Sequence, residues 1–390
     1  MYPTITDMLK DLLGIYLPLP IQTYGFFLAV TFIVCAYLVS KEMQRKEAGG
    51  LMHSSTQKFL KGEPASVTSM IINGAIGFFV GYKLLFGIFN YQSCSSNPQA
   101  LLLSGEGNIL GGILGAAISV FFHYREKQKN KLPKPEWVEE AILPHQHMAN
   151  IVTIAAVLGI AGAKLFDVIE NIDALMKDPL GVILSFSGLA FYGGLICATI
   201  GLLVYAKKNK IGILPLCDAA APALMLGYAI ARIGCQLAGD GDWGLPNDAP
   251  KPGWMSFLPD WMWSFDYPNN VIHANLKQDF INMGLESITG KAWPTPFYET
   301  VMGTILFLFL WSIRKRITTP GILFCVYLIV NGIERFLIET IRINDKYNFL
   351  GIELSQAQII AVSLIAIGVI GMLYLNKNKE KFLQMYQTQS

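Results

Sequence analysis

The sequence predicts an all-α polytopic membrane protein with about nine transmembrane helices, and three observations support this prediction. Hydrophobic residues make up 53% of the 390 residues and charged residues only 15%, a composition too apolar for an ordinary soluble protein. Apolar runs of about twenty residues recur along the chain, and each is long enough to cross a hydrocarbon core of roughly 30 Å. The runs are continuous rather than alternating, which indicates helices and not the strands of a membrane barrel.

The predicted helices follow one another along the whole chain. They cover residues 22–40, 67–89, 108–124, 149–170, 181–206, 214–238, 297–313, 320–341 and 356–375. Residues 1–375 are therefore expected to form a single helical membrane domain, with 239–296 as an outer, periplasmic loop region and 376–390 as a cytoplasmic tail. The stretch WMSFLPDWMWSFDYP in the outer loop predicts either a lid that rests on the membrane surface or an ordered loop with interfacial tryptophans.

Lysine and arginine residues predict that the N-terminus lies outside and the C-terminus inside. With this orientation the inner segments contain nineteen basic residues and the outer segments seven. Such an excess on the inner side is the charge bias that orients membrane proteins. The four remaining basic residues, Lys83, Lys164, Arg232 and Arg335, lie inside predicted helices near their outer ends. A charge at that depth is costly. The two lysines are expected to extend to the headgroup region, whereas the two arginines, with polar neighbours, are candidates for function.

Residues 67–127 and 155–210 form an internal repeat. GFFVGYKLLF in the first copy resembles GIAGAKLF in the second, so that Lys83 matches Lys164, and the later stretches SGEGNILGGILG and SGLAFYGGLI also match. Both copies run from inside to outside and back, which makes them parallel repeats and disfavours a transporter built from inverted repeats. The first copy is expected to be an extra, structural duplicate.

Arg232 and Arg335 stand among residues suited to an anionic ligand. Arg232 precedes the glycine-rich end of its helix, where the backbone can turn with positive φ and approach a ligand closely. Arg335 lies in NGIERFLIETIR, where Asn331, Glu339 and Arg342 follow a helical spacing and place a polar ladder on one face. An internal ion pair between Arg335 and Glu339 that only allows the helix to pack is the structural alternative.

No metal site is expected from the sequence. The segment DGD at 240–242 lacks the twelve-residue pattern and closing glutamate of a calcium loop. His145 and His147 form an H-x-H pair, but they lie in a basic inner loop, where solvated histidines are far commoner than metal ligands. A basic, aromatic-rich surface that would bind nucleic acid is not evident in the sequence either.

Five motifs together resemble a known family. They are FYGGLI (191–196), DAAAP (218–222), ARIGCQLAGDGDWG (231–244), PTPFYE (294–299) and NGIERFLIETIR (331–342). With these motifs the sequence resembles the prolipoprotein diacylglyceryl transferase family over residues 150–345, and TYGFFLA at 23–29 matches the family's Tyr-Gly motif on the first helix.

The resemblance implies a transferase that performs the first step of lipoprotein maturation. Members move the diacylglyceryl group of phosphatidylglycerol to the thiol of the lipobox cysteine in a prolipoprotein signal peptide, and glycerol 1-phosphate leaves. The resemblance therefore implies phosphatidylglycerol, such signal peptides and the bilayer as partners, with no cofactor. It also implies a multi-pass protein of the bacterial cytoplasmic (inner) membrane with its active site toward the outer leaflet. A guanidinium group suits this chemistry because it binds phosphate oxygens in a bidentate manner.

The family's functional residues match this sequence position by position. The resemblance implies catalytic roles for Arg232, Arg335, Glu339, Asp240 and Asp242; the loop is one residue longer than in many members, so either aspartate occupies the position of the family acid. It implies substrate-binding roles for Tyr24, Tyr192, Gly193, Gly194, Cys235, Gly244, Tyr298 and Glu299.

Two departures from the family bear on the chemistry. Tyr192 stands where many members have histidine, and Cys235 stands where many have asparagine. The substrate thiol must lose its proton, since the thiolate is the nucleophile and a free cysteine has a pKa of about 8.5. A tyrosine with an ordinary pKa of about 10 is a poor base for this proton. The base stays open among Asp240, Asp242, Glu299 and Glu339, with His273 of the outer loop a distant fifth.

Two other classes of protein fit the same composition. An anion transporter would place arginines along a path to both faces, whereas the helix cations here lie toward one face. A catalytically inactive scaffold that binds lipid or signal peptides is the second alternative, and Tyr192 and Cys235 are the residues in its favour. Solute flux in proteoliposomes would indicate the transporter, and binding without product would indicate the scaffold.

Overall fold

Nine long helices dominate the part of the chain that the structure, a computed structural model, describes: residues 1–17, 21–90, 105–184, 190–349 and 351–387. They are α2 (Thr23–Ala48), α3 (Val67–Phe89), α6 (Ile109–Lys129), α7 (Met148–Glu170), α10 (Phe191–Lys208), α11 (Ile213–Ala238), α13 (Thr295–Ile313), α14 (Ile322–Ile338) and α15 (Gln356–Lys377). Six of them, α2, α3, α7, α11, α13 and α15, are long and apolar enough to cross a membrane. The chain is a polytopic all-α membrane protein, whereas the number and orientation of its spanning helices stay predictions.

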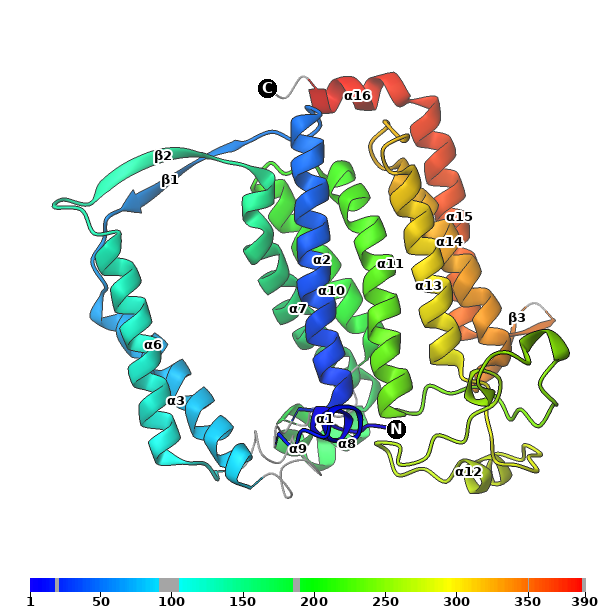
Figure 1. Cartoon of the computed structure of the whole chain (residues 1–390). Coiled ribbons are helices and arrows are strands. Elements are labelled where there is room, and N and C mark those ends of the chain that lie inside the picture. Colours follow the sequence, from blue (N-terminus) through cyan, green and yellow to red (C-terminus); the bar gives the residue numbers. More distant parts are fainter. Residues whose placement is uncertain (18–20, 91–104, 185–189, 350, 388–390) are drawn as a thin grey trace.

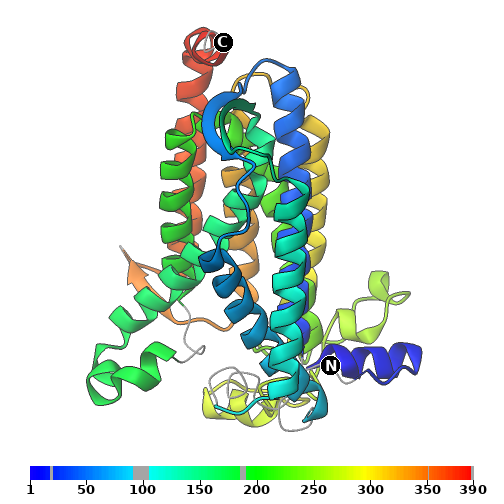
Figure 2. The ribbon, with the colours of Figure 1, turned by 90° about the vertical axis from the view of Figure 1, so that its left-hand side faces the viewer.

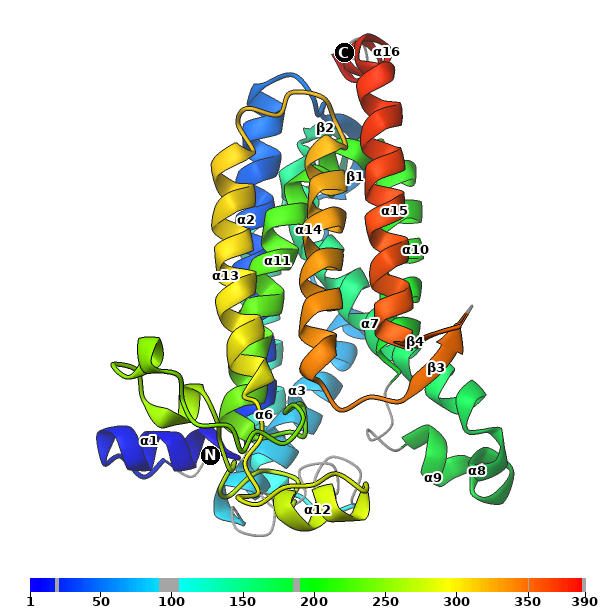
Figure 3. The same ribbon diagram turned by 90° about the vertical axis from the view of Figure 1, so that its right-hand side faces the viewer.

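Shorter elements occupy the ends of the molecule. They are α1 (Ile5–Leu13), α8 (Ile172–Lys177), α9 (Pro179–Leu184), α12 (Leu276–Asn282), α16 (Lys379–Gln387), the 3-10 turns η1 (Pro144–His147), η2 (Gly253–Met255), η3 (Asp260–Met262) and η4 (Glu339–Ile341), and the hairpin β3 (Lys346–Phe349) with β4 (Ile352–Ser355). The C-terminus and α16 lie at one end of the bundle, and the N-terminus and α12 lie at the other (Figure 3).

Several predicted helix boundaries are wrong. The helix α2 ends at Ala48 rather than at residue 40, and α6 ends at Lys129 rather than at residue 124. The run 181–206 was expected as one helix, but α9 ends at Leu184 and α10 begins only at Phe191, with residues 185–189 outside the described part. The run 320–341 was expected to be continuous, but α14 ends at Ile338 and the chain tightens into η4. A 3-10 turn at a helix end is common because it satisfies carbonyl groups that the last α-helical turn leaves unpaired.

The helix α11 forms the centre of the bundle, between α2 on one side and α13 and α14 on the other (Figures 1 and 3). Half of the residues in its most apolar stretch are buried, a larger share than in the other candidate spans of the described chain. Its small residues explain this position, because alanine and glycine allow neighbouring helices to approach closely. The residues of α11 therefore have access to several helices at once.

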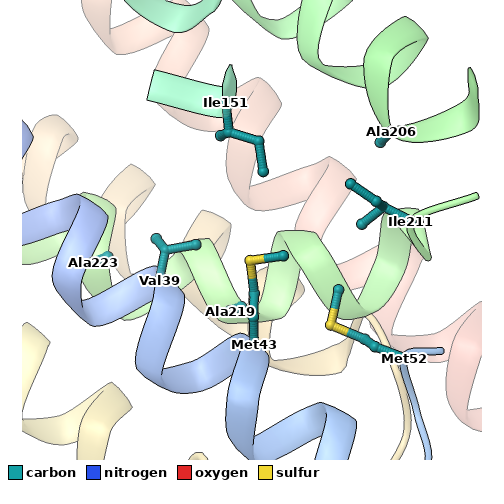
Figure 4. Packing of buried hydrophobic residues seen from close by; sticks show 8 residues of the cluster. All are labelled: Val39, Met43, Met52, Ile151, Ala206, Ile211, Ala219 and Ala223. Carbon is teal, nitrogen blue, oxygen red and sulfur yellow. The ribbon is translucent and has the colours of Figure 1, made fainter. Parts of the chain in front are cut away.

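A hydrophobic core and a polar clamp hold the C-terminal end of the bundle together. The core consists of Val39, Met43, Met52, Ile151, Ala206, Ile211, Ala219 and Ala223 (Figure 4). Beside it the carboxylate of Asp218 accepts hydrogen bonds from Lys46 Nζ at 3.2 Å and from the backbone N–H groups of Gly321 at 2.9 Å and Phe324 at 3.0 Å. Asp218 of the DAAAP motif thus caps the start of α14, which is a structural role.

Two helical hairpins, α3 with α6 and α7 with α10, share the same glycine contact. A Cβ atom added to Gly81 would lie 2.1 Å from the carbonyl oxygen of Gly111, and one added to Gly162 would lie 2.6 Å from that of Gly193. Gly194 similarly faces the carbonyl oxygen of Gly159. Only glycine permits such an approach of two helix backbones. The matched contacts agree with the predicted repeat, and they explain the second glycine pair by packing between α7 and α10.

A β-ribbon that the sequence reading missed joins the α3–α6 hairpin to the bundle. Strands β1 (Ser55–Lys61) and β2 (Glu136–Ile142) pair antiparallel, with Lys61 opposite Glu136. Figure 1 shows the hairpin beside the bundle, and Figure 2 shows the curved ribbon at the end that contains the C-terminus. The repeat copy 67–127 is therefore an insertion between two paired strands. Residues 91–104 of this copy lie outside the described part.

The outer loop region is ordered around its own small core. Trp243, Tyr267, Leu276, Phe280 and Ala292 form a buried cluster in it. The Phe265 and Tyr267 rings pack edge to face at 4.8 Å, and the Trp243 ring lies 5.1 Å from that of Tyr267. The loop is therefore ordered, whereas a lid that rests on the membrane surface stays a prediction. Of the rings in WMSFLPDWMWSFDYP, Tyr267 is buried, while Trp254 and Phe257 have 72% and 79% of their surface exposed.

Candidate active site

Four segments that are distant in the sequence meet at the loop end of the bundle. They are the end of α11, the loop 239–244, the start of α13 and the junction of α14 with η4 (Figure 3). Gly239 ends α11 with φ of 66°, a left-handed conformation that glycine adopts without strain. An isolated β-bridge then joins Gly244 to Arg342, which ties the loop to the end of α14.

Arg232 lies in the last two turns of α11 and is held from several sides. Its NH1 group contacts the Asp242 carboxylate, and its Nε atom lies 3.2 Å from Glu299 Oε2. The guanidinium plane also covers the Tyr228 ring at 5.3 Å from the ring centroid, a cation–π contact. The side chain is 16% exposed. Arg232 is therefore a fixed cation and not a group that extends into water.

Glu299 is the centre of an arginine cluster, although the sequence predicted it to be a substrate-binding residue. Its carboxylate lies 3.2 Å from Arg232 Nε, Arg335 NH1 and Arg342 NH1. The Tyr228 hydroxyl donates to Glu299 Oε1 at 2.7 Å. The side chain has no exposed surface, and a buried carboxylate requires such partners. Glu299 therefore holds the side chains of three arginines in place.

Arg335 and Glu339 form the ion pair that the sequence suggested, at 3.0 Å between NH2 and Oε2. Glu339 also accepts hydrogen bonds from Ser355 Oγ at 2.9 Å and from the Asn344 amide. The Arg335 side chain is 25% exposed, against 16% for Arg232 and 10% for Arg342. Arg335 is therefore the most accessible cation of the cluster.

Arg342 belongs to the site, although the sequence predicted it to lie in an outer segment after the helix. Because α14 ends at Ile338, the backbone at Arg342 is extended, with φ of −88° and ψ of 156°. Its guanidinium contacts the carboxylate of Asp242 and both carboxylate oxygens of Glu299, each of the latter at 3.2 Å. Its place at the end of the polar ladder was the available signal, although the extended backbone that positions it was not predicted.

Asp242 bridges two of the arginines. Its Oδ2 atom contacts Arg232 and its Oδ1 atom contacts Arg342, while its backbone carbonyl accepts from Thr295 Oγ1 at 2.6 Å. Burial alone would raise the pKa of this carboxyl, but the two guanidinium groups outweigh burial and lower that pKa. The side chain is 33% exposed, so Asp242 lies on the accessible side of the cluster and Glu299 on its buried side.

Asp240 and Cys235 lie beside Asp242. The Cys235 Sγ atom and one carboxylate oxygen of each aspartate are within 4.8 Å of one another. Burial, and next the charge of Asp242, raise the pKa of Asp240. Both oxygens of Asp242 already face guanidinium groups, which disfavours a cation at this place. The expectation of no metal stays a prediction with this physical support.

Gly244 is required by close backbone contact. Its N–H donates to Trp293 O at 2.9 Å, and the next N–H, of Leu245, donates to Ile341 O at 2.8 Å. A Cβ atom at Gly244 would lie 2.4 Å from Ile341 O and 2.8 Å from Thr295 Cγ2. The glycine therefore brings the loop against the strand-like segment that contains Arg342. Its expected role in substrate binding stays a prediction, and its contacts are structural.

The three tyrosines expected to bind substrate lie around the cluster. Tyr24 of α2 packs beside Gly234, whose added Cβ would lie 3.3 Å from the Tyr24 Cα atom. Tyr192 at the start of α10 lies within electrostatic range of Arg335 and Glu339. The rim of the site thus includes α2 and α10.

Tyr298 has a different environment. Its hydroxyl donates to the backbone carbonyl of Met262 at 2.8 Å, and its ring lies 6.3 Å from that of Trp293. It anchors the outer loop to α13, directly before the buried Glu299. The Tyr-Glu pair of the PTPFYE motif therefore holds the loop with one residue and the arginines with the other.

Known proteins match this chain over the part that contains the site. A sequence profile described as prolipoprotein diacylglyceryl transferase matches residues 131–374. The phosphatidylglycerol–prolipoprotein diacylglyceryl transferase of Dehalococcoides mccartyi is 31% identical over 58% of this chain and 76% of its own length. Proteins of the same name from Shouchella clausii and Streptococcus agalactiae are 27% and 28% identical, over 66% and 61% of this chain and 81% and 82% of their own lengths. The chain belongs to the prolipoprotein diacylglyceryl transferase family.

Proposed function

We propose that this protein transfers the diacylglyceryl group of phosphatidylglycerol to the lipobox cysteine of prolipoproteins and releases glycerol 1-phosphate. The observation that supports this most is the convergence of Arg232, Arg335 and Arg342 on one point at the loop end of the bundle. Guanidinium groups fixed by buried carboxylates are suited to an anionic headgroup, and the relatives are named for this lipid and this reaction.

The lipid phosphate binds at the accessible side of the cluster, where Asp242 now bridges two arginines. Three guanidinium groups face three paired carboxylates, those of Asp242, Glu299 and Glu339. A phosphodiester would add one negative charge to this balanced set. Glu299 and Glu339 are buried, so Asp242 is the carboxylate that can turn away to solvent and release two guanidinium groups. Two anionic oxygens of the phosphate then replace the two oxygens of Asp242.

The arginines also lower the barrier of the transfer. The thiolate attacks the lipid glycerol carbon that is bonded to the phosphate oxygen, and this carbon–oxygen bond breaks. Negative charge grows on the departing phosphate, so fixed arginines stabilise the transition state more than the ground state. Because Arg232 and Arg342 keep their contacts to the buried Glu299, they need no reorganisation when the charge develops.

The site faces the outer leaflet of the bacterial inner membrane in this proposal. The positive-inside bias of the sequence supports this orientation, since the arginine cluster lies at the end opposite the basic segments and α16. A signal peptide that ends in a lipobox would present its cysteine at this depth. The fixed arginines lie at one end of the bundle, which agrees less well with a path for anion transport.

The experiment uses the full chain in lipid nanodiscs that contain phosphatidylglycerol, with a synthetic lipobox peptide and intact-mass detection. We expect a diacylglyceryl mass addition on the cysteine, and its loss in Arg232→Ala and Arg335→Ala. Arg45→Ala is the matched control, because Arg45 makes an ion pair with Glu42 far from the cluster. An absence of product from folded wild-type protein with bound phosphatidylglycerol would refute the proposal and favour a lipid-binding scaffold.

A further inference from the structure

Asp240 is a partly buried residue with one fully enclosed carboxylate oxygen. It is the first residue after Gly239, which turns the chain at the end of α11. Its Oδ1 atom is enclosed by protein and has no hydrogen-bond partner. Buried polar atoms almost always have partners, so an unsatisfied carboxylate oxygen in a catalytic region requires an explanation. A proton acceptor that awaits its substrate is such an explanation.

Two of the other three acids are committed to arginines. Both oxygens of Asp242 contact guanidinium groups, one of Arg232 and one of Arg342. Glu299 is fully buried among Arg232, Arg335 and Arg342. Cationic partners stabilise the ionised form of a carboxylate and make it a weaker base. The oxygens of both acids are therefore occupied by guanidinium groups and are not available to a substrate thiol.

Glu339 is engaged in a similar way. Arg335 lies at 3.0 Å from one of its oxygens, and Ser355 at 2.9 Å and Asn344 donate to the other. Asp240, by contrast, makes no ion pair among the described residues. Its carboxylate is hydrogen-bonded only by Cys235 and the Asp242 backbone, and its Oδ1 atom accepts no hydrogen bond. Of the four acids that the sequence left open, Asp240 has the greatest capacity to accept a proton.

The groups around Asp240 act on its pKa in both directions, with a net rise: burial and Asp242 raise it, whereas Arg232 and hydrogen bonds from Cys235 and the Asp242 backbone lower it. The ionisable groups that face it from α2, α11 and the outer loop are Tyr24, Arg232, Cys235, Asp242 and Tyr267. Burial has the largest effect on the pKa of Asp240 and raises it, and the neighbouring charge of Asp242 raises it further. A carboxylate whose pKa is raised is a stronger base than an ordinary aspartate.

We propose that Asp240 is the catalytic base that removes the proton of the lipobox thiol, an assignment that rests on the proposed function. The S–H proton passes to a carboxylate oxygen of Asp240, and the sulfur keeps the electron pair. The thiolate then forms the carbon–sulfur bond as the carbon–oxygen bond breaks and its electrons leave with glycerol 1-phosphate. Asp240 replaces in this way the histidine that many relatives have where this chain has Tyr192.

The position of Asp240 suits this step. One of its oxygens lies within 4.8 Å of a carboxylate oxygen of Asp242, and Asp242 occupies the place of the lipid phosphate in the proposed function. A thiol that reaches Asp240 therefore loses its proton beside the bound lipid, close to the carbon that it attacks. Proximity of base, nucleophile and electrophile lowers the entropic cost of the reaction.

The test compares Asp240→Asn with wild type between pH 6 and pH 9.5, with both the transfer rate and the affinity for phosphatidylglycerol measured. We expect the transfer rate of the variant to fall about 100-fold or more near neutral pH, the size typical of a lost general base. Phosphatidylglycerol affinity should change less than twofold. The deficit should shrink as the pH approaches the thiol pKa of about 8.5, since the thiol then ionises without help. Asp260→Asn, in the same outer loop and paired with Lys251, is the matched control.

A second nucleophile separates a base from a structural group. A lipobox peptide with selenocysteine contains a selenol that is already ionised at neutral pH, so Asp240→Asn should transfer to it at a near wild-type rate. If Asp240→Asn does not fold, Asp240→Ser is used instead. If neither variant folds, the pH dependence of the wild-type transfer rate is measured with both peptides. We expect this rate to fall at acidic pH with the thiol peptide and not with the selenol peptide. A variant whose transfer rate is reduced equally at every pH and with both peptides would overturn the assignment. So would a wild-type rate that falls equally at acidic pH with both peptides. Wild type that modifies neither peptide would instead refute the proposed function.

Discussion

Replacement of Asp242 by asparagine should strengthen the binding of phosphatidylglycerol. In the proposed function the lipid phosphate must displace the Asp242 carboxylate from Arg232 and Arg342. Asparagine keeps the size of the side chain but removes its charge, so both guanidinium groups become available at a lower cost. The effect opposes the usual result of a mutation in a binding site, which makes it diagnostic.

The magnitude follows from the two contacts. A hydrogen bond to a charged group contributes about 1.5–3 kcal/mol. Asp242 makes two such contacts, but its side chain is 33% exposed, so solvent screening reduces each to the low end or below. A net gain of about 1.4–2.8 kcal/mol remains, which corresponds to a tenfold to hundredfold lower Kd for the lipid.

The assay is titration of phosphatidylglycerol into nanodiscs of neutral lipid that contain the full chain, with bound lipid measured by native mass spectrometry. Asp260→Asn again serves as the control, because it removes an outer-loop carboxylate that contacts a lysine and not the cluster. An unchanged or higher Kd in a folded Asp242→Asn protein would refute the exchange of carboxylate for phosphate, and Asp242 would then be a support for the arginines.

Four other outcomes are expected. Gly244→Ala should destabilise the protein by about 1–3 kcal/mol, seen as a lower thermal midpoint, and should reduce transfer, because the new methyl group would overlap the Ile341 carbonyl oxygen. Replacement of residues 62–135 by an Asn-Gly turn should leave folding and transfer intact in the mass assay, since the flanking residues are already paired in the ribbon. Arg342→Lys should reduce transfer at least about tenfold, as one ammonium group cannot contact two carboxylates like a guanidinium fork. The pKa of Asp242 is lowered in the folded protein, so its ion pairs stabilise the fold above the unfolded-state pKa of about 3.9. This contribution is lost as the pH falls through the lower folded value. The free energies of unfolding of wild type and Asp242→Asn should therefore become equal below that pH in acid-unfolding experiments.

The helices were predictable because a membrane-spanning segment must be apolar along its whole length. The prediction was accurate for α3 and α11, where the hydrophobic run and the helix coincide within one residue. It was wrong at the start of α10, because the apolar run continues across that boundary, and at the end of α14, because a 3-10 turn replaces the last α-helical turn. The ribbon of β1 and β2 was missed because its strands are about eighty residues apart and their pairing has no local signal.

The site was predictable only in part from its residues. Arg232 and Arg335 were evident, because a charge inside an apolar run requires compensation. The compensating groups were less evident: Arg342 lies beyond the helix end, and Tyr228 is an ordinary residue of an apolar run until its hydroxyl meets Glu299. Glu299 appeared to be a ligand-binding acid, and only the fold shows that three cations surround it.

The antiparallel ribbon has a consequence for how this chain can change over time. Because Lys61 and Glu136 are paired, the inserted segment leaves the bundle and returns to it at the same point. Its described residues form a helical hairpin, α3 with α6, that starts and ends at the ribbon, so its gain or loss does not invert the direction of any later helix. A gene could therefore acquire or delete the whole segment in one event, and α11, α13 and α14 would still present their arginines on the same side of the membrane.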